Sequence, residues 1–262
     1  MPVLDAEVRW RETLTGDSRT LQQIRSFMRR LPSAPRCKLC YAPFHGVGRL
    51  IAPWFGPWPK NPQICRNCIV SLMKNGVGGA EVPVSLLFVD IRGSTGLGEA
   101  MRPMEFTALL QAFYRIAAAA IVKEFGVVDK FVGDEAIGLF IPGFTGPFHA
   151  ARAIAAGREI LAHCARPDAS PRGPIPAGGG VHTGIAFVGS VGPSEEISDF
   201  TALGDSVNAT ARLASLAAAG ELLVSRAAAE AAALDIRGLP ASTVEVRGRE
   251  EALDVVSLRD AA

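Results

Sequence analysis

Cysteine and aspartate are the residues of this sequence whose spacing points most directly to chemistry. Four of the five cysteines form two Cys-x-x-Cys pairs, Cys37 with Cys40 and Cys65 with Cys68, and 24 residues separate the pairs. A tight turn within each pair can present both sulfurs to one ion, and four thiolates hold a structural Zn²⁺ tetrahedrally. We expect zinc, with an iron site or Fe–S cluster and a dithiol redox pair as the alternatives. The fifth cysteine, Cys164, is predicted to be a buried core thiol.

Two aspartates stand at the ends of predicted strands. Asp90 follows the apolar run 84–89 and precedes the polar loop 92–95, and Asp134 lies at the tip of a predicted hairpin. Paired carboxylates beside a Gly-Ser-Thr loop suit Mg²⁺ that is held together with substrate phosphates. Taken singly, each aspartate is explained as readily by the capping of a turn.

Asn208 and Arg212 are a second polar pair. They are four residues apart on a predicted helix and therefore share one of its faces. An asparagine and an arginine on one face suit a polar ligand such as a nucleotide, and the alternative is a solvated helix surface.

The elements that must position these residues alternate between strand and helix. Apolar periodicity predicts strands at 84–89, 127–132, 136–141, 180–189, 222–225, 244–247 and 254–257, and helices at 103–124, 147–165 and 205–218. Strand–helix–strand–strand–helix–strand is the order of a ferredoxin-like split β-α-β sheet, a mixed α/β (α+β) fold. In that fold the strands of Asp90 and Asp134 are neighbours, so both carboxylates meet at one end of the sheet. We expect the helices to cover one face.

The chain before residue 80 is organised differently. An apolar period over 18–31 predicts an amphipathic helix within an N-terminal helical segment, 1–31. Residues 32–76 form a four-cysteine, zinc-ribbon-like module, where five prolines between Cys40 and Cys65 leave little room for regular structure. A small domain with so little regular structure needs additional stabilisation, such as a bound metal. The glycines at 76–79 are predicted to be a linker to the domain at 82–260.

Charge also divides the chain. Residues 1–80 carry 12 Lys and Arg against 4 Asp and Glu, whereas residues 81–262 carry 15 against 22. A basic module that packs on an acidic domain explains this better than nucleic-acid binding, because no basic run exceeds two residues. The sequence has no apolar run long enough to span a bilayer and no secretory signal near its start. We therefore expect a cytoplasmic protein with no membrane partner.

Together, the polar segments resemble the catalytic domain of class III nucleotidyl (adenylyl and guanylyl) cyclases. The similarity rests on Phe88–Thr95, Asp129–Asp134 and Asp199–Arg212, and both Gly184 and Val246–Gly248 agree with it. It covers residues 82–260. Each fragment is short, but six functional positions in the family's order make the match specific.

The resemblance assigns a role to each matching position. Asp90, Asp134 and the backbone carbonyl of Ile91 would hold two divalent ions, Mg²⁺ or Mn²⁺. Asn208 would orient the ribose, and Arg212 would neutralise charge on the α-phosphate as pyrophosphate leaves. The residues expected to bind phosphate oxygens are Gly93, Ser94, Thr95 and, from the family's last hairpin, Arg247.

The family positions that read the base match Lys130 and Thr201. Lysine is a pure donor and suits adenine N1, and a threonine hydroxyl can accept from the 6-amino group. GTP would present its N1–H to the lysine, and an unpaired buried polar group costs about 1–3 kcal/mol. The resemblance therefore implies an adenylyl cyclase that converts ATP to cyclic AMP. Many animal enzymes have an aspartate at the position of Thr201. Threonine adds a hydrogen-bond donor there, which reduces the selectivity for ATP over GTP.

The family's sites lie between two catalytic domains, and this chain carries both halves of a site. The resemblance therefore implies a homodimer with two equivalent sites. The cysteine module precedes the catalytic domain, as regulatory modules often do in such cyclases. We hypothesise that the 18–31 helix and this module set the relative placement of the two catalytic domains; a rigid structural module is the alternative.

Two other functions stay open at the level of sequence. Gly133-Asp134-Glu135 faintly resembles the signature of diguanylate cyclases, but Val132 and Ala136 depart from it, and a guanylyl cyclase is the nearer variant. A non-catalytic protein that binds nucleic acid or another partner through its cysteine module would use the cyclase-like domain only to dimerise. An intact set of metal, base and transition-state positions argues against that function.

Overall fold

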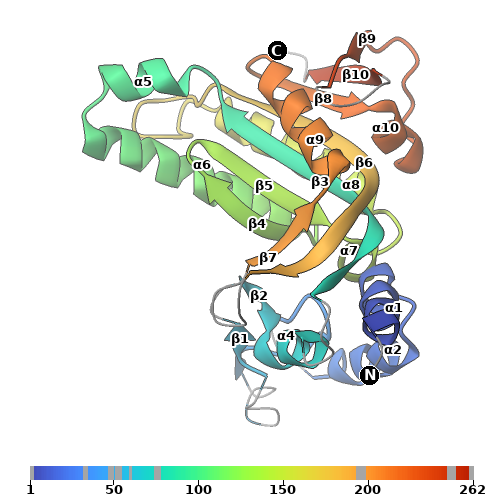
Figure 1. Cartoon of the computed structure of the whole chain (residues 1–262). Coiled ribbons are helices and arrows are strands. Elements are labelled where there is room, and N and C mark those ends of the chain that lie inside the picture. The colour runs from blue at the N-terminus through green and yellow to red at the C-terminus, as the bar shows by residue number, and fades with distance from the viewer. Residues whose placement is uncertain are drawn as a thin grey trace. The chain divides into compact units, whose positions relative to one another are not determined.

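Pairing of strands far apart in the sequence builds the main sheet of this computed structural model (Figure 1). The model describes residues 3–31, 35–46, 50, 55–58, 61–73, 78–192, 199–246 and 252–259. Over these residues the eight-stranded sheet has the order β4-β5-β3-β6-β8-β10-β9, and β7 pairs with β6. Its strands are β3 (Gly79–Ile91), β4 (Val127–Val132), β5 (Glu135–Phe140), β6 (Ala177–Val191), β7 (Asp199–Leu203), β8 (Glu221–Ser225), β9 (Ala241–Val244) and β10 (Leu253–Arg259). The order β4-β5-β3-β6 confirms the predicted ferredoxin-like core.

The chain forms two compact units. The first comprises Met1–Pro83, Ile141–Pro147 and Ile185–Leu203, and the second comprises Val84–Phe140, Phe148–Gly184 and Gly204–Ala262. The first unit therefore takes in β7 and the short helix α7 (Pro142–Thr145) together with the residues before β3.

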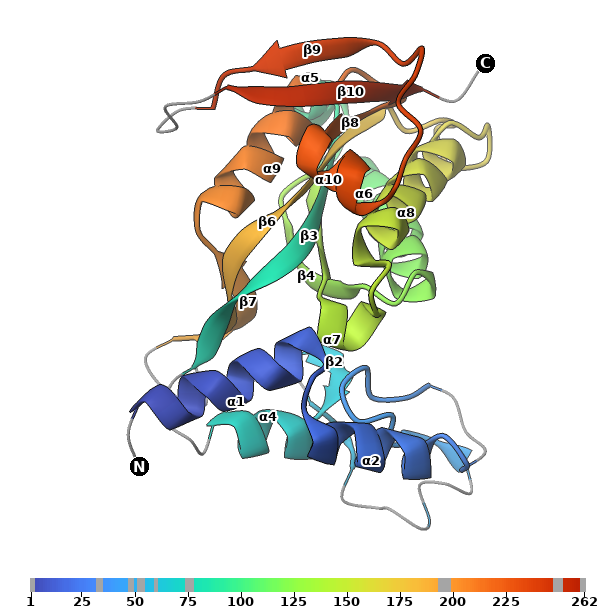
Figure 2. The ribbon, with the colours of Figure 1, turned by 90° about the vertical axis from the view of Figure 1, so that its right-hand side faces the viewer.

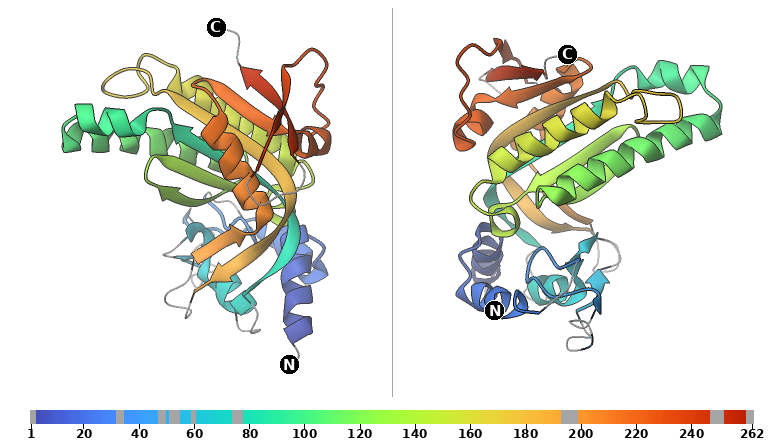
Figure 3. Two further views of the ribbon diagram at one scale, coloured as in Figure 1. Left: turned by 45° about the horizontal axis from the view of Figure 1, so that its top comes forward. Right: turned by 180° about the vertical axis from the view of Figure 1, so that it is seen from behind.

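Two long helices cover one face of the sheet in the second unit. α6 (Pro103–Lys123) and α8 (His149–Cys164) lie side by side there (Figure 3). Their buried stripes enter one apolar cluster that includes Phe113 of α6, Ile160 and Cys164 of α8, and Leu222 and Val224 of β8. Cys164 is thus the core thiol that the sequence predicts, and burial raises its pKa to about 12.

α9 (Asp205–Leu216) lies on the opposite face, so the prediction that the helices cover a single face was wrong (Figure 2). Leu213 of α9 packs with Leu223 of β8, whose side chain alternates with those of Leu222 and Val224. The cause is connectivity: β6 and β8 pair in parallel, so the chain must cross over between them, and α9 belongs to that crossover.

One helix in the described part of the chain, α6, is long and apolar enough by composition to cross a membrane. Its Leu109, Phe113, Ala117 and Ile121 are buried in the cluster shared with α8 and the sheet. This is the packing of a core helix.

The first unit confirms the predicted amphipathic helix as α2 (Arg19–Met28), whose N-cap Ser18 accepts a hydrogen bond from the Leu21 N–H. The unit also contains α1 (Val3–Thr15), a hairpin of β1 (Pro57–Trp58) and β2 (Asn61–Cys65), and α4 (Arg66–Met73). In α1 the buried residues Ala6, Trp10 and Leu14 are spaced four apart, which gives one apolar stripe.

Two sequence predictions need correction at the strand ends. The predicted linker glycines Gly78 and Gly79 lie against β6, where a Cβ on Gly79 would stand 2.3 Å from the Val188 carbonyl oxygen. They permit two backbones to approach closely and do not form a free linker. The strand predicted at 244–247 is instead β9, Ala241–Val244: Glu245 and Val246 follow it outside the strand, and Arg247 lies outside the described residues. α4, α7, α10 (Arg226–Ala231) and β7 have no predicted counterpart.

Candidate active site and cysteine cluster

The antiparallel pairing of β3 with β5 brings together the two aspartates, which we call the carboxylate pair. Asp90 stands opposite Glu135 in the register, and the Ile91 N–H donates to the Asp134 carbonyl oxygen at 3.2 Å. Asp90 and Asp134 therefore meet at one end of the sheet, as the ferredoxin-like topology predicts.

The turn that carries Asp134 is held by a neighbouring helix. Gly133 has a left-handed φ of 60° at the first position of a two-residue turn, where type II′ hairpins require glycine. The hydroxyl of Tyr114, on α6, donates to the Gly133 carbonyl oxygen, and its ring stacks on Phe131 with centroids 4.3 Å apart. The helix thus fixes the position of the Asp134 backbone.

The two carboxyl groups differ in their electrostatic environment. Burial, followed by the neighbouring Asp134, raises the pKa of Asp90 to about 7. Burial also opposes ionisation of Asp134, but hydrogen bonds from the Ser94 hydroxyl and from Asp90 outweigh it and hold the Asp134 pKa below its usual value. When both groups are ionised, the buried Oδ1 of Asp90 has no hydrogen-bond donor. A divalent cation with oxygen ligands fits this arrangement, because it would satisfy Oδ1 and offset the mutual repulsion.

Arg92 is a residue of this site that the sequence analysis did not single out. Its Nη2 donates to Oδ2 of Asp90, and its Nη1 donates to the Ser215 and Ala217 carbonyl oxygens at 3.0 and 3.4 Å. It therefore joins the carboxylate pair to the C-terminal end of α9. No motif at this position signals that contact, because residues 215 and 217 are distant in the sequence.

α9 carries Asn208 and Arg212, which are both exposed. Their helix lies close to β6, since a Cβ on Gly180 would stand 2.6 Å from the Ala214 nitrogen. Arg212 donates through Nε to the Glu245 carbonyl oxygen at 3.4 Å. The second unit thus contains the carboxylate pair and, on another element, the exposed polar pair that a nucleotide would need.

The remaining predicted site residues are distributed over several elements. Gly93 and Thr95 are exposed at the start of α5 (Ser94–Ala100), where Gly93 has a φ of 70°. Lys130 follows a bulge in β4, and its Nζ lies 4.0 Å from Oδ1 of Asp129. Thr201 is buried on β7 in the first unit. Arg247 lies outside the described residues.

The first unit contains the second candidate site, the cysteine cluster, formed by the four Sγ atoms of Cys37, Cys40, Cys65 and Cys68. All four sulfurs lie within 4.8 Å of one another. Cys37 and Cys68 are 3.9 Å apart and Cys40 and Cys65 are 3.6 Å apart. A tetrahedral ion with metal–sulfur bonds of about 2.3 Å would separate its sulfurs by about 3.8 Å. The spacing fits a shared ion and exceeds the roughly 2.0 Å of a disulfide.

Hydrogen bonds and charge in the cluster also fit a cation. The Cys65 N–H donates to Sγ of Cys37 at 3.2 Å, and the Cys68 N–H donates to Sγ of Cys65 at 3.4 Å. Burial opposes ionisation of Cys37, but hydrogen bonds from the other thiols hold its pKa well below the usual value. Hydrogen bonds to Cys37 raise the pKa of Cys40 and Cys68. The hydrogen bonds therefore favour ionisation of Cys37 over that of Cys40 and Cys68, and a shared cation would stabilise further thiolates.

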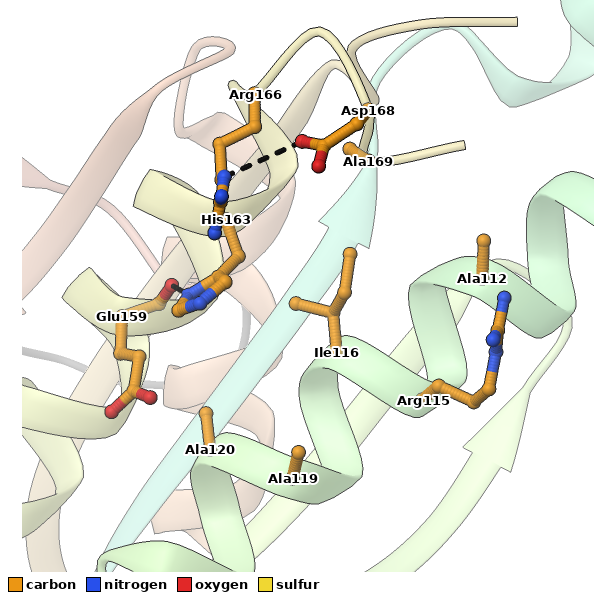
Figure 4. A pocket seen from close by; sticks show the side chains of 10 residues that line it. All are labelled: Ala112, Arg115, Ile116, Ala119, Ala120, Glu159, His163, Arg166, Asp168 and Ala169. Atoms are coloured by element: carbon orange, nitrogen blue, oxygen red, sulfur yellow. Dashed lines mark hydrogen bonds and ion pairs between the residues drawn. The ribbon is translucent and has the colours of Figure 1, made fainter. Parts of the chain in front are cut away.

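A cavity of about 360 Å³ between α6 and α8 contains none of these residues (Figure 4). Arg115 and several alanines of α6 line it together with His163 and Arg166, and Arg166 pairs with Asp168 at 3.4 Å. The candidate chemistry at the carboxylate pair and at the cysteine cluster therefore involves none of the residues that line this cavity.

Comparison with known proteins agrees with these observations. A family model described as "Adenylate and Guanylate cyclase catalytic domain" matches residues 80–257. An adenylate cyclase of Anabaena cylindrica is 33% identical over 147 residues, which cover 51% of this chain and 27% of that protein. Adenylate cyclase 1 of Rhizobium meliloti is 29% identical over 178 residues, covering 66% and 27%. The chain spans less than a third of the length of the curated relatives it matches.

Solved structures of both specificities are similar to the chain. The guanylyl cyclase Cya2 has a TM-score of 0.63 and 28% identity over 69% of this chain and 93% of that one. The adenylyl cyclase CyaB of P. aeruginosa has a TM-score of 0.60 and 26% identity over 71% and 98%.

Proposed function

The chain belongs to the adenylate and guanylate cyclase catalytic-domain family, and from this we propose that it converts ATP to 3′,5′-cyclic AMP and pyrophosphate. The observation that carries the proposal is the carboxylate pair, with its buried unsatisfied Oδ1, at the end of β3 and β5. Two divalent ions held by Asp90, Asp134 and the Ile91 carbonyl would activate the ribose 3′-hydroxyl and neutralise the triphosphate.

The polar residues outside the carboxylate pair then bind and orient the nucleotide. Asn208 hydrogen-bonds the ribose, and Arg212 offsets the charge that develops on the α-phosphate. Gly93, Ser94 and Thr95 bind phosphate oxygens through their amides, and Arg247 supplies a further cation in this proposal. Most of the catalysis comes from positioning and electrostatics, because phosphoryl transfer needs little covalent chemistry from the protein.

Lys130 and Thr201 are the groups proposed to select adenine. Lys130 can only donate, which matches the acceptor at adenine N1, and the Thr201 hydroxyl can accept from the 6-amino group. The side chain of Lys130 is 37% exposed and its ion pair with Asp129 is long, so the ammonium group is available to a ligand. Guanylyl cyclase activity is the second candidate, favoured by the likeness to Cya2.

We further propose that the active form is a homodimer and that the cysteine cluster holds Zn²⁺. Asn208 and Arg212 are exposed, as groups that complete a partner's site must be. Apolar side chains are also exposed on β4, where Phe131 is 36% and Val132 is 54% accessible. Four thiols at tetrahedral spacing, three of them buried, favour zinc, with iron as the alternative.

Turnover of the full chain with ATP and with GTP, each with Mg²⁺ or Mn²⁺, tests the proposal. Products are identified by mass spectrometry, and the Asp134→Ala variant is the inactive control. Cyclic AMP from the wild type and none from the variant is the expected result, and Lys130→Glu should shift the preference toward GTP. Cyclic GMP from the wild type would overturn the adenine assignment. A dimer that binds neither nucleotide would contradict the catalytic role altogether.

A further inference from the structure

The cysteine cluster and the proposed base-reading residue Thr201 belong to the same compact unit, and a continuous series of contacts joins them. We propose that metal binding at the cysteine cluster sets the affinity for the purine base, through Arg25, α7 and β7. The inference rests on the proposed function for the role of Thr201, and it names the residues through which the N-terminal module would act.

The first step is the contact of Arg25 with the turn between two metal ligands. Its Nε donates to the Leu39 carbonyl oxygen at 2.6 Å, and its Nη2 donates to the Lys38 carbonyl oxygen at 3.4 Å. Both acceptors lie between Cys37 and Cys40. A turn that presents two sulfurs to one ion also holds these two carbonyls in fixed positions. The two hydrogen bonds of the guanidinium therefore depend on the closed conformation of the turn.

The second step joins Arg25 to α7. Nη2 of the same guanidinium donates to the Gly143 carbonyl oxygen. On its other side Gly143 contacts the end of α1, where a Cβ on the glycine would stand 2.3 Å from the Thr13 carbonyl oxygen and 2.6 Å from that of Leu14. α7 is thus packed between the guanidinium and a helix end with no free space, and a shift of Arg25 must displace it.

The third step runs from α7 to β7. The rings of Phe144 and Phe200 lie 6.1 Å apart at an angle of 23°, and both are almost fully buried. Such a buried aromatic pair stabilises the contact between α7 and β7 beyond the apolar area it buries. Phe200 directly precedes Thr201, which pairs with Gly189 of β6. A displacement of α7 therefore reaches the residue proposed to accept from the base.

The element with two states is the Cys37–Cys40 turn. With a cation bound, four sulfurs at 3.6–3.9 Å separations are held closed. Without one, no ion joins the four sulfurs, and the site loses the interaction that organises it. Arg25 then loses two of its three carbonyl acceptors, and α7 loses its fixed partner.

The test compares Arg25→Lys with Arg29→Lys in the full chain. Both arginines lie over the Tyr41 ring, at 5.5 and 4.7 Å, but Arg25 carries the hydrogen bonds to the turn and to α7. Lysine keeps the charge and removes the fork that spans them. Bound zinc is counted by elemental analysis, and amide exchange is followed at 142–146, 199–203 and, as reference, 221–225.

We expect Arg25→Lys to retain one zinc and to exchange about tenfold faster at 142–146 and 199–203, with 221–225 unchanged, within the range of typical couplings. Chelation of zinc should speed exchange at 199–203 in the wild type and in Arg29→Lys, but add little in Arg25→Lys. The KM for ATP should rise in Arg25→Lys while kcat changes less than twofold.

Exchange at 199–203 that is the same with and without zinc in the wild type would overturn the inference, as would an Arg25→Lys profile identical to that of Arg29→Lys. The exchange arms need no turnover. If the protein made no cyclic nucleotide, the proposed function would fail while the coupling of the cluster to β7 was still decided.

Discussion

The carboxylate pair and the cysteine cluster both bring like-charged groups together, but their scaffolds differ. Asp90 and Asp134 are positioned by the ladder of two paired strands and by a turn that Tyr114 holds. The cysteines come from a turn, a short hairpin and the start of α4, and contacts among the four sulfurs join these segments. A metal at the first site would supply chemistry to a sheet that strand pairing already builds, whereas a metal at the second would stabilise the fold of the module itself.

The double variant Cys37→Ser, Cys40→Ser should have the largest effect, because it tests whether the cysteine module depends on a metal for its fold. Structural zinc in comparable modules contributes about 10–16 kcal/mol of folding free energy, so loss of two ligands should unfold the cysteine module. We expect rapid proteolysis within residues 35–73 and loss of the bound metal, measured by mass spectrometry of the fragments and by elemental analysis. Cys164→Ala is the matched control, since it removes a core thiol far from the cluster in sequence. A protease-resistant double variant would show that the module holds itself together without the ion.

Asp134→Ala applies the same kind of change to the other region. Loss of the Asp134 carboxylate should lower kcat/KM by about a thousandfold, which corresponds to roughly 4 kcal/mol of transition-state stabilisation. The melting temperature should stay close to that of the wild type, because strand pairing rather than this side chain positions the end of the sheet. Scanning calorimetry beside steady-state kinetics separates the two effects. Unfolding of the variant would mean that the carboxylate, like the cysteines, is part of the scaffold.

The same difference explains how far the sequence could lead. Apolar periodicity predicted β3, β4, β5, α6 and α8, because regular elements leave a repeating pattern, and their topology brought Asp90 beside Asp134. Arg92 and Arg25 left no such pattern. Each acts on backbone carbonyls, which every residue has, and some of these lie more than a hundred positions away. Contacts of that kind appear only once the chain is folded.

Gly143→Ala probes the packing of α7 within the first unit. The added methyl group would stand 2.3 Å from a backbone oxygen at the end of α1, so helix and glycine must separate, at about 1–3 kcal/mol for overpacking. The expected result is a lower denaturant midpoint for the first unit. Gly96→Ala is the control, since nothing lies within 4 Å of a Cβ there and α5 gains a better helix former. Equal midpoints for the two variants would show that α7 adapts to the change.

The Glu221→Gln variant tests whether the main sheet also depends on a buried charge. The Glu221 carboxylate, 8% exposed, accepts from the Ala218 N–H at 2.8 Å, the Ser257 hydroxyl at 2.5 Å and Arg259 Nη2 at 3.1 Å. These hydrogen bonds outweigh burial and lower its pKa in the folded state. The unfolded chain therefore binds the proton more tightly, and the stabilisation is present above the ordinary glutamate pKa, about 4.3.

The wild type should exceed Glu221→Gln by about 1–3 kcal/mol in free energy of unfolding at pH 7, the cost of weakening a buried charged network. The difference should shrink as the pH falls below about 4.3 and through the lower folded-state pKa. Urea titrations at several pH values measure both quantities. A difference that does not change with pH would mean that the shape of the side chain, and not its charge, holds β8 to β10. The charge of Glu221 would then not stabilise the pairing of β8 with β10. The sheet would differ even more from the cysteine module, which we expect to depend on a bound ion.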